Sequence, residues 1–233
     1  MSDYLFRFKQ FSVAQDRCAM KIGMDACVFG SWFKAGNHIL DVGTGTGILS
    51  LMAAQRFPDA LITAVEIDVA AFSQASENFR HSPWSSRLKT IHTSFLNVEE
   101  NAHFDHIISN PPYFNNAIKS QQEQRDLARH DESLSIEGLI VKAKSLLKSN
   151  GKLSVIFPSD DKRLPQSALD QGFFVRRKCQ LIPTRSKPVL RNMWEFGLNP
   201  SELELSDLII EQEGSRRLTL AAWNLTKEFY LEF

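Results

Sequence analysis

The residues best suited to chemistry are Asn110, Pro111, Pro112 and Tyr113, which close an apolar segment expected to be a strand (104–110). The two prolines hold the backbone in an extended course and remove two N–H donors, so the carbonyl of Pro111 can act as an acceptor. Asn110 adds a side-chain carbonyl, and Tyr113 offers a flat face. Two acceptors beside a stacking surface predict a site for an exocyclic ring amine that gains positive charge as it attacks. The structural alternative is a rigid proline turn with a surface tyrosine.

A second feature is the glycine-rich segment DVGTGTG (41–47), which lies between an apolar strand (38–43) and an expected helix (48–57). Glycines allow a tight turn and close approach of a ligand, and the start of the helix exposes unpaired N–H groups. Asp41 precedes the first glycine, which suits a cationic sulfonium ligand better than a pyrophosphate. Glu66 ends the next strand, about 20 residues on, where a carboxylate can accept ribose hydroxyls. The alternative is a strand–helix turn without a ligand, since related loops occur in unrelated proteins.

The elements that must position these residues alternate between strand and helix. Strands are expected over 38–43, 61–68, 88–95, 104–110 and 151–159, and helices over 48–57, 69–80 and 134–148, the last ending at Asn150-Gly151. After residue 172, strands over 173–183 and 189–199 have no helix between them and predict an antiparallel pair at a sheet edge. A further strand near 207–212 and a helix over 217–231 end the chain. The pattern predicts an α/β fold with a mostly parallel sheet.

Length and composition are those of an ordinary globular protein. The 233 residues, 43% hydrophobic and 23% charged, fit a single domain over 1–233, with 1–35 as an N-terminal segment that completes the site and 36–233 as the core. No apolar run is long enough for a membrane span and no signal peptide is recognisable, so we expect a cytoplasmic protein without membrane association. Cys18, Cys27 and Cys179 suit reduced thiols, and the histidines show no metal spacing, so no metal site is predicted.

The net charge is zero, but basic residues concentrate in the C-terminal half. They are Lys162, Arg163, Arg176, Arg177, Lys178, Arg185, Lys187 and Arg191. Such a patch could attract phosphates. A solvated rim of strands and loops is the simpler explanation, so the patch is supporting evidence only.

On these motifs the chain resembles the N6-adenine and N5-glutamine methyltransferases with NPPY-type motifs. It is most similar to the bacterial tRNA (adenine-N6)-methyltransferases that modify the adenine beside the anticodon of a valine tRNA. The resemblance spans nearly the whole chain, including FKQFSVAQDRCAMKIGMDACVFGSW, DVGTGTG, AVEID, ISNPPYF, RDLAR and LTKEFYLEF. It implies the Rossmann-like class I methyltransferase fold, a seven-stranded sheet of order 3-2-1-4-5-7-6 with helices on both faces. It also implies S-adenosyl-L-methionine as cofactor, tRNA as partner and no obligatory protein partner.

The resemblance assigns roles residue by residue. Asn110, Pro111, Pro112 and Tyr113 would hold the amine. The cofactor would contact Lys21, Asp41, Gly43, Thr44, Gly45, Gly47, Glu66, Ile67, Ser94, Phe95 and Asn110. Arg125 and Arg129 would meet the RNA, with a solvated polar helix as the alternative. Arg185 of the basic patch is a further candidate for RNA contact.

The chain also departs from its relatives. Where they usually carry an acid for the cofactor adenine, it has Thr93-Ser94-Phe95, so a hydroxyl contact from Ser94 or stacking on Phe95 would replace the carboxylate. Gln15 and Met24 stand where relatives commonly have histidine and threonine. Two other functions stay open at this point: the same chemistry on a protein glutamine or a DNA adenine, and a non-catalytic cofactor-binding scaffold for RNA.

Overall fold

A central eight-stranded sheet organises the computed structural model, which describes residues 4–18, 20–101, 103–111 and 134–231. Its strands are β3 (His38–Val42), β4 (Leu61–Glu66), β5 (Leu88–His92), β6 (Phe104–Ser109), β7 (Leu147–Pro158), β8 (Phe174–Ile182), β9 (Arg191–Gly197) and β10 (Glu204–Ile209). They lie in the order β10-β8-β9-β7-β6-β3-β4-β5. Read from β5, the first seven follow the predicted order 3-2-1-4-5-7-6. A separate two-stranded hairpin pairs β1 (Leu5–Arg7) with β2 (Ser12–Ala14).

Strand direction also follows the prediction. β9 runs antiparallel to both β7 and β8, whereas the strands from β5 to β7 are mutually parallel. The sheet has eight strands rather than seven because β10 pairs in parallel with β8. The first four residues of β10 are exposed, which suits a sheet edge and explains why the sequence carries little apolar signal there.

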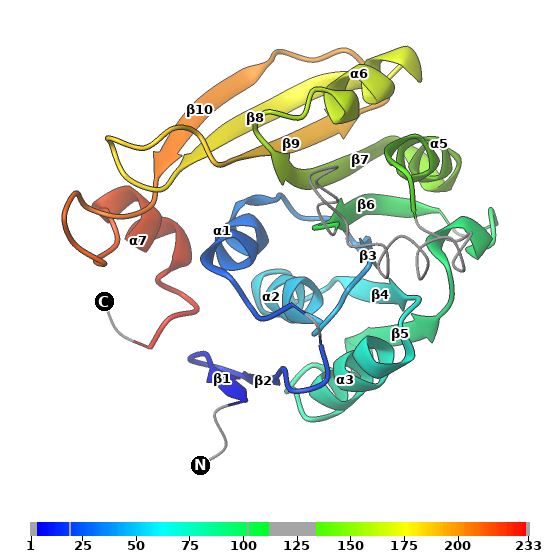
Figure 1. Ribbon diagram of the computed structural model, residues 1–233. Helices are drawn as coiled ribbons and strands as arrows, with labels where there is room; N and C mark the ends of the chain where they lie inside the picture. Colours follow the sequence, from blue (N-terminus) through cyan, green and yellow to red (C-terminus); the bar gives the residue numbers. More distant parts are fainter. Residues whose placement is uncertain (1–3, 19, 102, 112–133, 232–233) are drawn as a thin grey trace, which may run out of the picture.

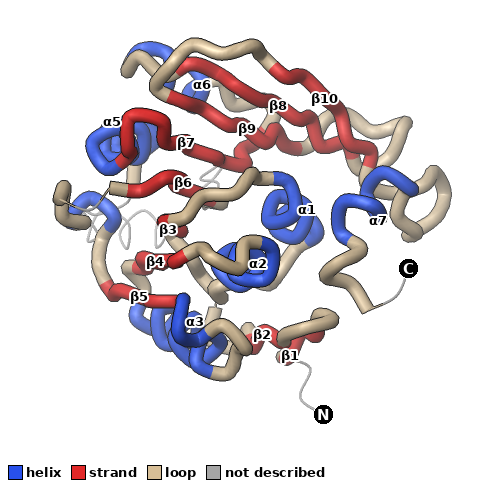
Figure 2. The backbone as a smooth tube through the Cα atoms, turned by 180° about the vertical axis from the view of Figure 1, so that it is seen from behind, coloured by secondary structure: helices blue, strands red, loops and turns tan. Residues whose placement is uncertain are grey.

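Helices cover both faces of the sheet (Figures 1 and 2). They are α1 (Met24–Trp32), α2 (Ile48–Arg56), α3 (Val69–Arg80), α5 (Ile136–Leu146), α6 (Arg163–Asp170) and α7 (Leu220–Thr226). Apolar side chains of α1, α2 and α7 join one core cluster, and those of α5 and α6 join a second. No helix in the described part of the chain is long and apolar enough to cross a membrane.

Several helix boundaries differ from the sequence prediction. α5 ends at Leu146, and Asn150-Gly151 lie instead within β7, where the pairing with β6 shifts register. Gly151 belongs in this bulge because a Cβ there would come within 2.9 Å of the Lys148 carbonyl oxygen. α6 was not predicted, and α7 is shorter than the expected 217–231.

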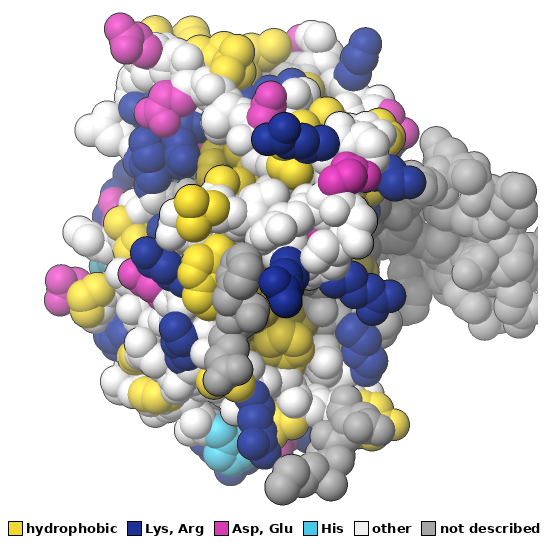
Figure 3. Space-filling view, turned by 90° about the vertical axis from the view of Figure 1, so that its left-hand side faces the viewer, with side chains coloured by type: hydrophobic (Ala, Val, Ile, Leu, Met, Phe, Trp, Pro, Cys, Tyr) yellow, Lys and Arg dark blue, Asp and Glu magenta, His cyan; other side chains and the backbone are white. Residues whose placement is uncertain are grey.

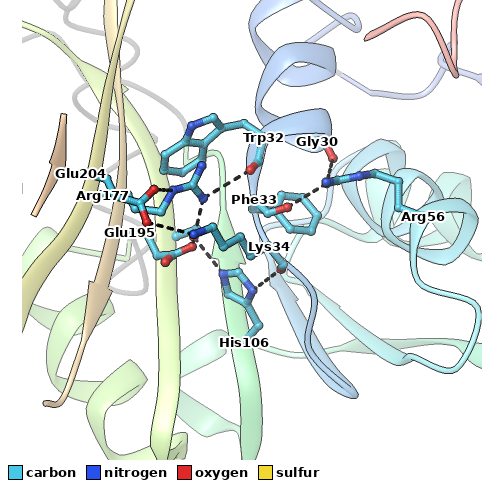
Figure 4. Close-up of polar contacts among 10 residues, drawn as sticks. Gly30, Trp32, Phe33, Lys34, Arg56, His106, Arg177, Glu195 and Glu204 are labelled. Atoms are coloured by element: carbon cyan, nitrogen blue, oxygen red, sulfur yellow. Dashed lines mark hydrogen bonds and ion pairs between the residues drawn. The ribbon is translucent and has the colours of Figure 1, made fainter. Parts of the chain in front are cut away.

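An ion-pair cluster that runs from the buried Glu195 to the exposed Glu204 fixes the end of α1 to the sheet (Figure 4). The Arg177 guanidinium lies 4.1 Å from the centre of the Trp32 ring and pairs with Glu195 at 3.4 Å and Glu204 at 3.2 Å. Because Glu195 is almost fully buried, its pairing with Arg177 offsets the cost of removing a carboxylate from water. α1 therefore has a fixed position relative to β8 and β9.

His106 of β6 is completely buried. Its ring nitrogens bond the Lys34 carbonyl and the Ser154 hydroxyl, each at 2.8 Å (Figure 4). Burial lowers the pKa of His106 to about 3, so the ring is neutral. It is a structural histidine that joins β6, β7 and the turn after α1.

Candidate functional site

Four neighbouring strands end at the same level and bring the predicted site residues together. Val42 of β3 is in register with Ser109 of β6 and Val65 of β4, and Glu66 is in register with His92 of β5. The residues that follow these positions therefore emerge at one edge. This is the carboxyl edge of a parallel sheet, where α/β proteins place their ligands.

A pocket of about 500 Å³ opens at this edge. Ten predicted residues line it: Lys21, Gly43, Thr44, Gly45, Glu66, Ile67, Ser94, Phe95, Asn110 and Pro111. Residues that the prediction did not name also line it, among them Arg17, Cys18, Met20, Ile22, Gly23, Asp25, Asp68, Ser109 and Leu134. Its volume lies within the usual range for sites of nucleoside-sized ligands.

The glycine loop lies at the base of this pocket. Gly45 has a positive φ of 57° and donates its N–H to Oε2 of Glu66 at 2.9 Å. Gly47 has a φ of 84°, and a Cβ there would lie 2.5 Å from the ring of Phe79. Any other residue at position 47 would strain the backbone and displace α3. Gly47 thus caps α2 and does not line the pocket.

Glu66 is held in place before any ligand arrives. Its Oε1 accepts the N–H groups of Ile67 at 2.9 Å and Asp68 at 3.0 Å, while Oε2 accepts that of Gly45. Oε2 keeps a second lone pair for a hydroxyl donor in the pocket, whereas Oε1 already accepts two bonds. The predicted bond to a ribose hydroxyl therefore fits Oε2 best.

Asp41 lies beneath the loop, completely buried, and is not part of the pocket wall. Its Oδ2 accepts the hydroxyls of Thr44 at 2.6 Å and Ser50 at 2.7 Å, and its Oδ1 has no hydrogen-bond partner among the described residues. Burial raises the pKa of Asp41 to about 6. The geometry gives Asp41 the task of shaping the loop from below.

Asp41→Asn is expected to change how stability depends on pH. The pKa of about 6 lies above the usual value for aspartate, so the folded chain holds this proton more tightly than the unfolded chain. This contribution to stability is complete below about pH 4 and is lost as pH rises through 6, a change of roughly 3 kcal/mol. The free energy of unfolding, measured with denaturant, should fall less between pH 4 and pH 7 in Asp41→Asn than in the wild type. An equal fall in both proteins would contradict the raised pKa of Asp41.

One wall of the pocket is the segment between β2 and α1, which we call the N-terminal wall. Oε1 of Gln15 accepts the N–H of Ile22 at 2.8 Å, and its backbone carbonyl accepts the Lys21 ammonium. Gln15 therefore closes the loop that carries Lys21 to the pocket. Gln15, which stands where relatives commonly have histidine, thus has a structural role in this chain.

The end of β5 supplies an apolar wall. Phe95 is 5% exposed, begins a short 3-10 helix (Phe95–Asn97) and packs in the second core cluster. Ser94 lies beside it, and its carbonyl accepts the N–H of Asn97 at 3.0 Å. The Ser94 hydroxyl caps no helix N–H, which leaves it suited to a ligand.

Asn110 and Pro111 directly follow β6 and line the same pocket as Gly43 and Glu66. Of the other predicted site residues, Pro112, Tyr113, Arg125 and Arg129 lie outside the described residues. Arg185 is exposed in the turn between β8 and β9 and does not line the pocket.

The fold matches that of solved methyltransferases. A crystal structure described as a predicted O-methyltransferase from Agrobacterium tumefaciens superposes with a TM-score of 0.69 over 87% of this chain and 95% of that one, at 20% identity. A methyltransferase from Pyrococcus furiosus superposes with a TM-score of 0.55 over 78% of this chain and 90% of its own, also at 20% identity. At such identities the likeness establishes the fold alone.

The sequence relatives are much closer. A tRNA1(Val) (adenine(37)-N6)-methyltransferase of Vibrio parahaemolyticus is 41% identical over 97% of this chain and 95% of its own length. One of Bacteroides thetaiotaomicron is 37% identical over 99% of both chains. The family model of the methyltransferase small domain matches residues 28–173. This chain therefore belongs to the methyltransferase small domain family, among the tRNA1(Val) (adenine(37)-N6)-methyltransferases.

Proposed function

We propose that this chain transfers the methyl group of S-adenosyl-L-methionine to N6 of an adenine in tRNA, adenine 37 of tRNA1(Val) in the first instance. The relatives carry that activity in their names and match the chain nearly end to end. The observation that supports the proposal best is that Asn110 and Pro111 line one pocket with Gly45 and Glu66. An amine acceptor set and a nucleoside site thus share a cavity. A tRNA substrate also favours a cytoplasmic location.

The pocket residues fit S-adenosylmethionine, which when bound supplies an electrophilic methyl on a positively charged sulfur. Oε2 of Glu66 has a lone pair for a ribose hydroxyl, and Phe95 offers apolar surface to the adenine. The buried Asp41 carboxylate, which accepts the hydroxyl of Thr44 in the glycine loop, places negative charge next to that loop. A ligand with a cationic end suits that field better than a pyrophosphate would.

Asn110 and Pro111 provide the acceptor chemistry. An exocyclic amine on adenine is a weak nucleophile because its lone pair is delocalised into the ring. Carbonyl acceptors that bind its two hydrogens draw the nitrogen toward tetrahedral geometry and stabilise the positive charge that develops on it. No strong general base is required, because the amine proton becomes acidic once the methyl is attached.

Alternative substrates are separated by acceptor competition. Labelled S-adenosylmethionine is offered with tRNA lacking the modification, with unmethylated adenine-containing DNA, or with a protein whose glutamine is exposed. Label should appear only in the tRNA. Label in DNA or in protein would identify that molecule as the substrate instead of tRNA. Cofactor binding without transfer to any acceptor would favour a non-catalytic scaffold.

The surface beside the pocket suits an RNA backbone. Turns at the carboxyl ends of β8 and β10 carry exposed basic side chains at Arg185, Lys187, Arg216 and Arg217. β8 lies three strand positions from β6, roughly 14 Å at the usual strand spacing. Lys and Arg side chains are spread over the face seen in Figure 3, with fewer acidic ones among them. These turns therefore support a phosphate-binding role for Arg185.

The double variant Arg185→Ala/Lys187→Ala should raise KM for tRNA about tenfold at low salt and leave the Kd of S-adenosylmethionine unchanged. Each lost phosphate contact should lower the slope of log KM against log salt by about 1. The matched control is Arg80→Ala/Lys89→Ala, which removes the exposed basic side chains at the end of α3 and in β5, the strand at the opposite edge of the sheet. An equal effect of both double variants would show that net charge, not this surface, matters.

A further inference from the structure

Asn78 of α3 joins two walls of the pocket through one buried amide. Its Nδ2 donates to the Ala14 carbonyl at 2.9 Å and the Thr46 carbonyl at 2.8 Å, and its Oδ1 accepts the N–H of Ala14 at 2.9 Å. Thr46 belongs to the glycine loop, and Ala14 ends β2, just before the pocket-lining residues Arg17, Cys18 and Met20 to Gly23. Asn78 is only 4% exposed and both of its donors are used.

Neighbouring side chains of α3 hold the same N-terminal segment. Oε1 of Gln74, one turn before Asn78, accepts the N–H of Arg17 at 3.0 Å. The Glu77 carboxylate pairs with the Arg17 guanidinium at the surface. These two contacts reach the N-terminal wall alone, whereas Asn78 also reaches the glycine loop.

α3 can make this connection because it packs directly on the glycine loop. The ring of Phe79 occupies the space that a Cβ of Gly47 would fill, so the helix sits at closest approach to the loop. Thr46 then lies within hydrogen-bond distance of Asn78. The two walls come from distant parts of the sequence, since Asn78 lies 32 positions after Thr46 and 64 positions after Ala14, which places Ala14 and Thr46 themselves 32 positions apart.

We propose that Asn78 is a positioning residue that sets the separation of the glycine loop and the N-terminal wall, and thereby the affinity for S-adenosylmethionine. The inference rests on the proposed function insofar as the pocket must hold that cofactor. Without the amide, the carbonyls of Ala14 and Thr46 lose their shared donor, and the walls keep only the indirect connection through α3 that Gln74 and Phe79 provide. Cofactor binding must then fix the separation of the two walls, which weakens affinity without altering the acceptor groups at Asn110 and Pro111.

The test measures cofactor binding and turnover separately in Asn78→Ala and Asn78→Asp. Asp retains the acceptor for the Ala14 N–H but removes both donors. Calorimetry should show the Kd of S-adenosylmethionine raised about tenfold or more in each, with KM for the cofactor raised in parallel. The kcat at saturating cofactor should stay within about threefold of wild type.

Limited trypsin digestion adds a readout of the wall itself. Cleavage after Arg17 and Lys21 should be suppressed by S-adenosylmethionine in the wild type. In Asn78→Ala, saturating cofactor should protect these bonds much less. Unchanged protection would contradict a link between loop and wall.

Two controls distinguish positioning from general stability. Glu77→Gln on the same helix loses only a surface ion pair to the N-terminal wall, and Thr226→Ala removes a buried helix hydroxyl on α7. Both should keep the wild-type Kd, even where Thr226→Ala lowers Tm as much as Asn78→Ala. A wild-type Kd in both Asn78 variants would overturn the inference. Failure of the wild type itself to bind S-adenosylmethionine would instead overturn the proposed function.

Discussion

Asn110→Ala should lower kcat about 10²–10³-fold and leave the Kd of S-adenosylmethionine within about threefold of wild type. The Asn110 carbonyl is proposed to stabilise charge that appears on the amine only during transfer, and loss of one such preorganised group has effects of this size. The Kd should change little because the glycine loop and Glu66, which are proposed to bind the cofactor, are unaltered. Steady-state methyl transfer at saturating tRNA and cofactor measures kcat, and calorimetry of cofactor binding measures the Kd.

The matched control for Asn110→Ala is Asn199→Ala, which truncates an asparagine in the turn after β9 that bonds the Ser149 carbonyl at 2.8 Å. It should leave both kcat and Kd unchanged. A near-normal kcat in Asn110→Ala would rule out the acceptor mechanism. A large rise in the Kd of S-adenosylmethionine would show that Asn110 acts mainly in cofactor binding.

Glu66→Ala should raise the Kd of S-adenosylmethionine roughly 100-fold. The change removes an acceptor for a ribose hydroxyl and also releases the N–H groups of Gly45, Ile67 and Asp68 that orient the loop. Hydrogen bonds to a charged group contribute about 1.5–3 kcal/mol each, which is a factor of ten to more than a hundred in affinity. Calorimetry at several salt concentrations measures the change.

Glu66→Gln separates the two contributions of this carboxylate. The amide of Glu66→Gln keeps one acceptor oxygen, but its NH₂ group faces a backbone N–H where the carboxylate had an acceptor. The Kd of S-adenosylmethionine for this variant should therefore lie between those for the wild type and Glu66→Ala. Glu204→Ala, which removes an exposed carboxylate at the sheet edge, should bind like the wild type. A wild-type Kd in Glu66→Ala would contradict the placement of the ribose.

Local patterns were enough to predict which residues meet around the centre of the pocket. The strand, the glycine turn and the helix that follow one another around Gly45 are contiguous in sequence, and so are β4 and Glu66. The parallel arrangement of these strands then brings their carboxyl ends together. The position of Asn110 beside the loop followed from the same rule.

Features that depend on distant contacts could not be predicted this way. The N-terminal wall is placed by Asn78, 64 positions away from Ala14 in sequence, and no local pattern signals that contact. Burial of His106 depends on Lys34 and Ser154, which belong to other elements. The place of β10 beside β8 likewise results from a parallel crossover, not from its own residues.

Asp41 shows the difference between finding a residue and assigning its role. Its place before the first glycine was recognisable, but the spacing could not show that its carboxylate points below the loop toward Thr44 and Ser50. Orientation depends on how the strand is packed against α2. Asp41 was expected to contact the cofactor directly. Its hydrogen bonds to Thr44 and Ser50 instead give it the role of supporting the glycine loop.

Transfer of label from S-adenosylmethionine to total tRNA that lacks N6-methyladenosine next to the anticodon, followed by digestion to nucleosides, tests the proposed reaction. The label should appear in N6-methyladenosine, and changing the adenine beside the anticodon of the valine tRNA to guanine should remove it. Label in any other nucleoside, or none in RNA while the chain binds S-adenosylmethionine, would show that the chain does not carry out this reaction.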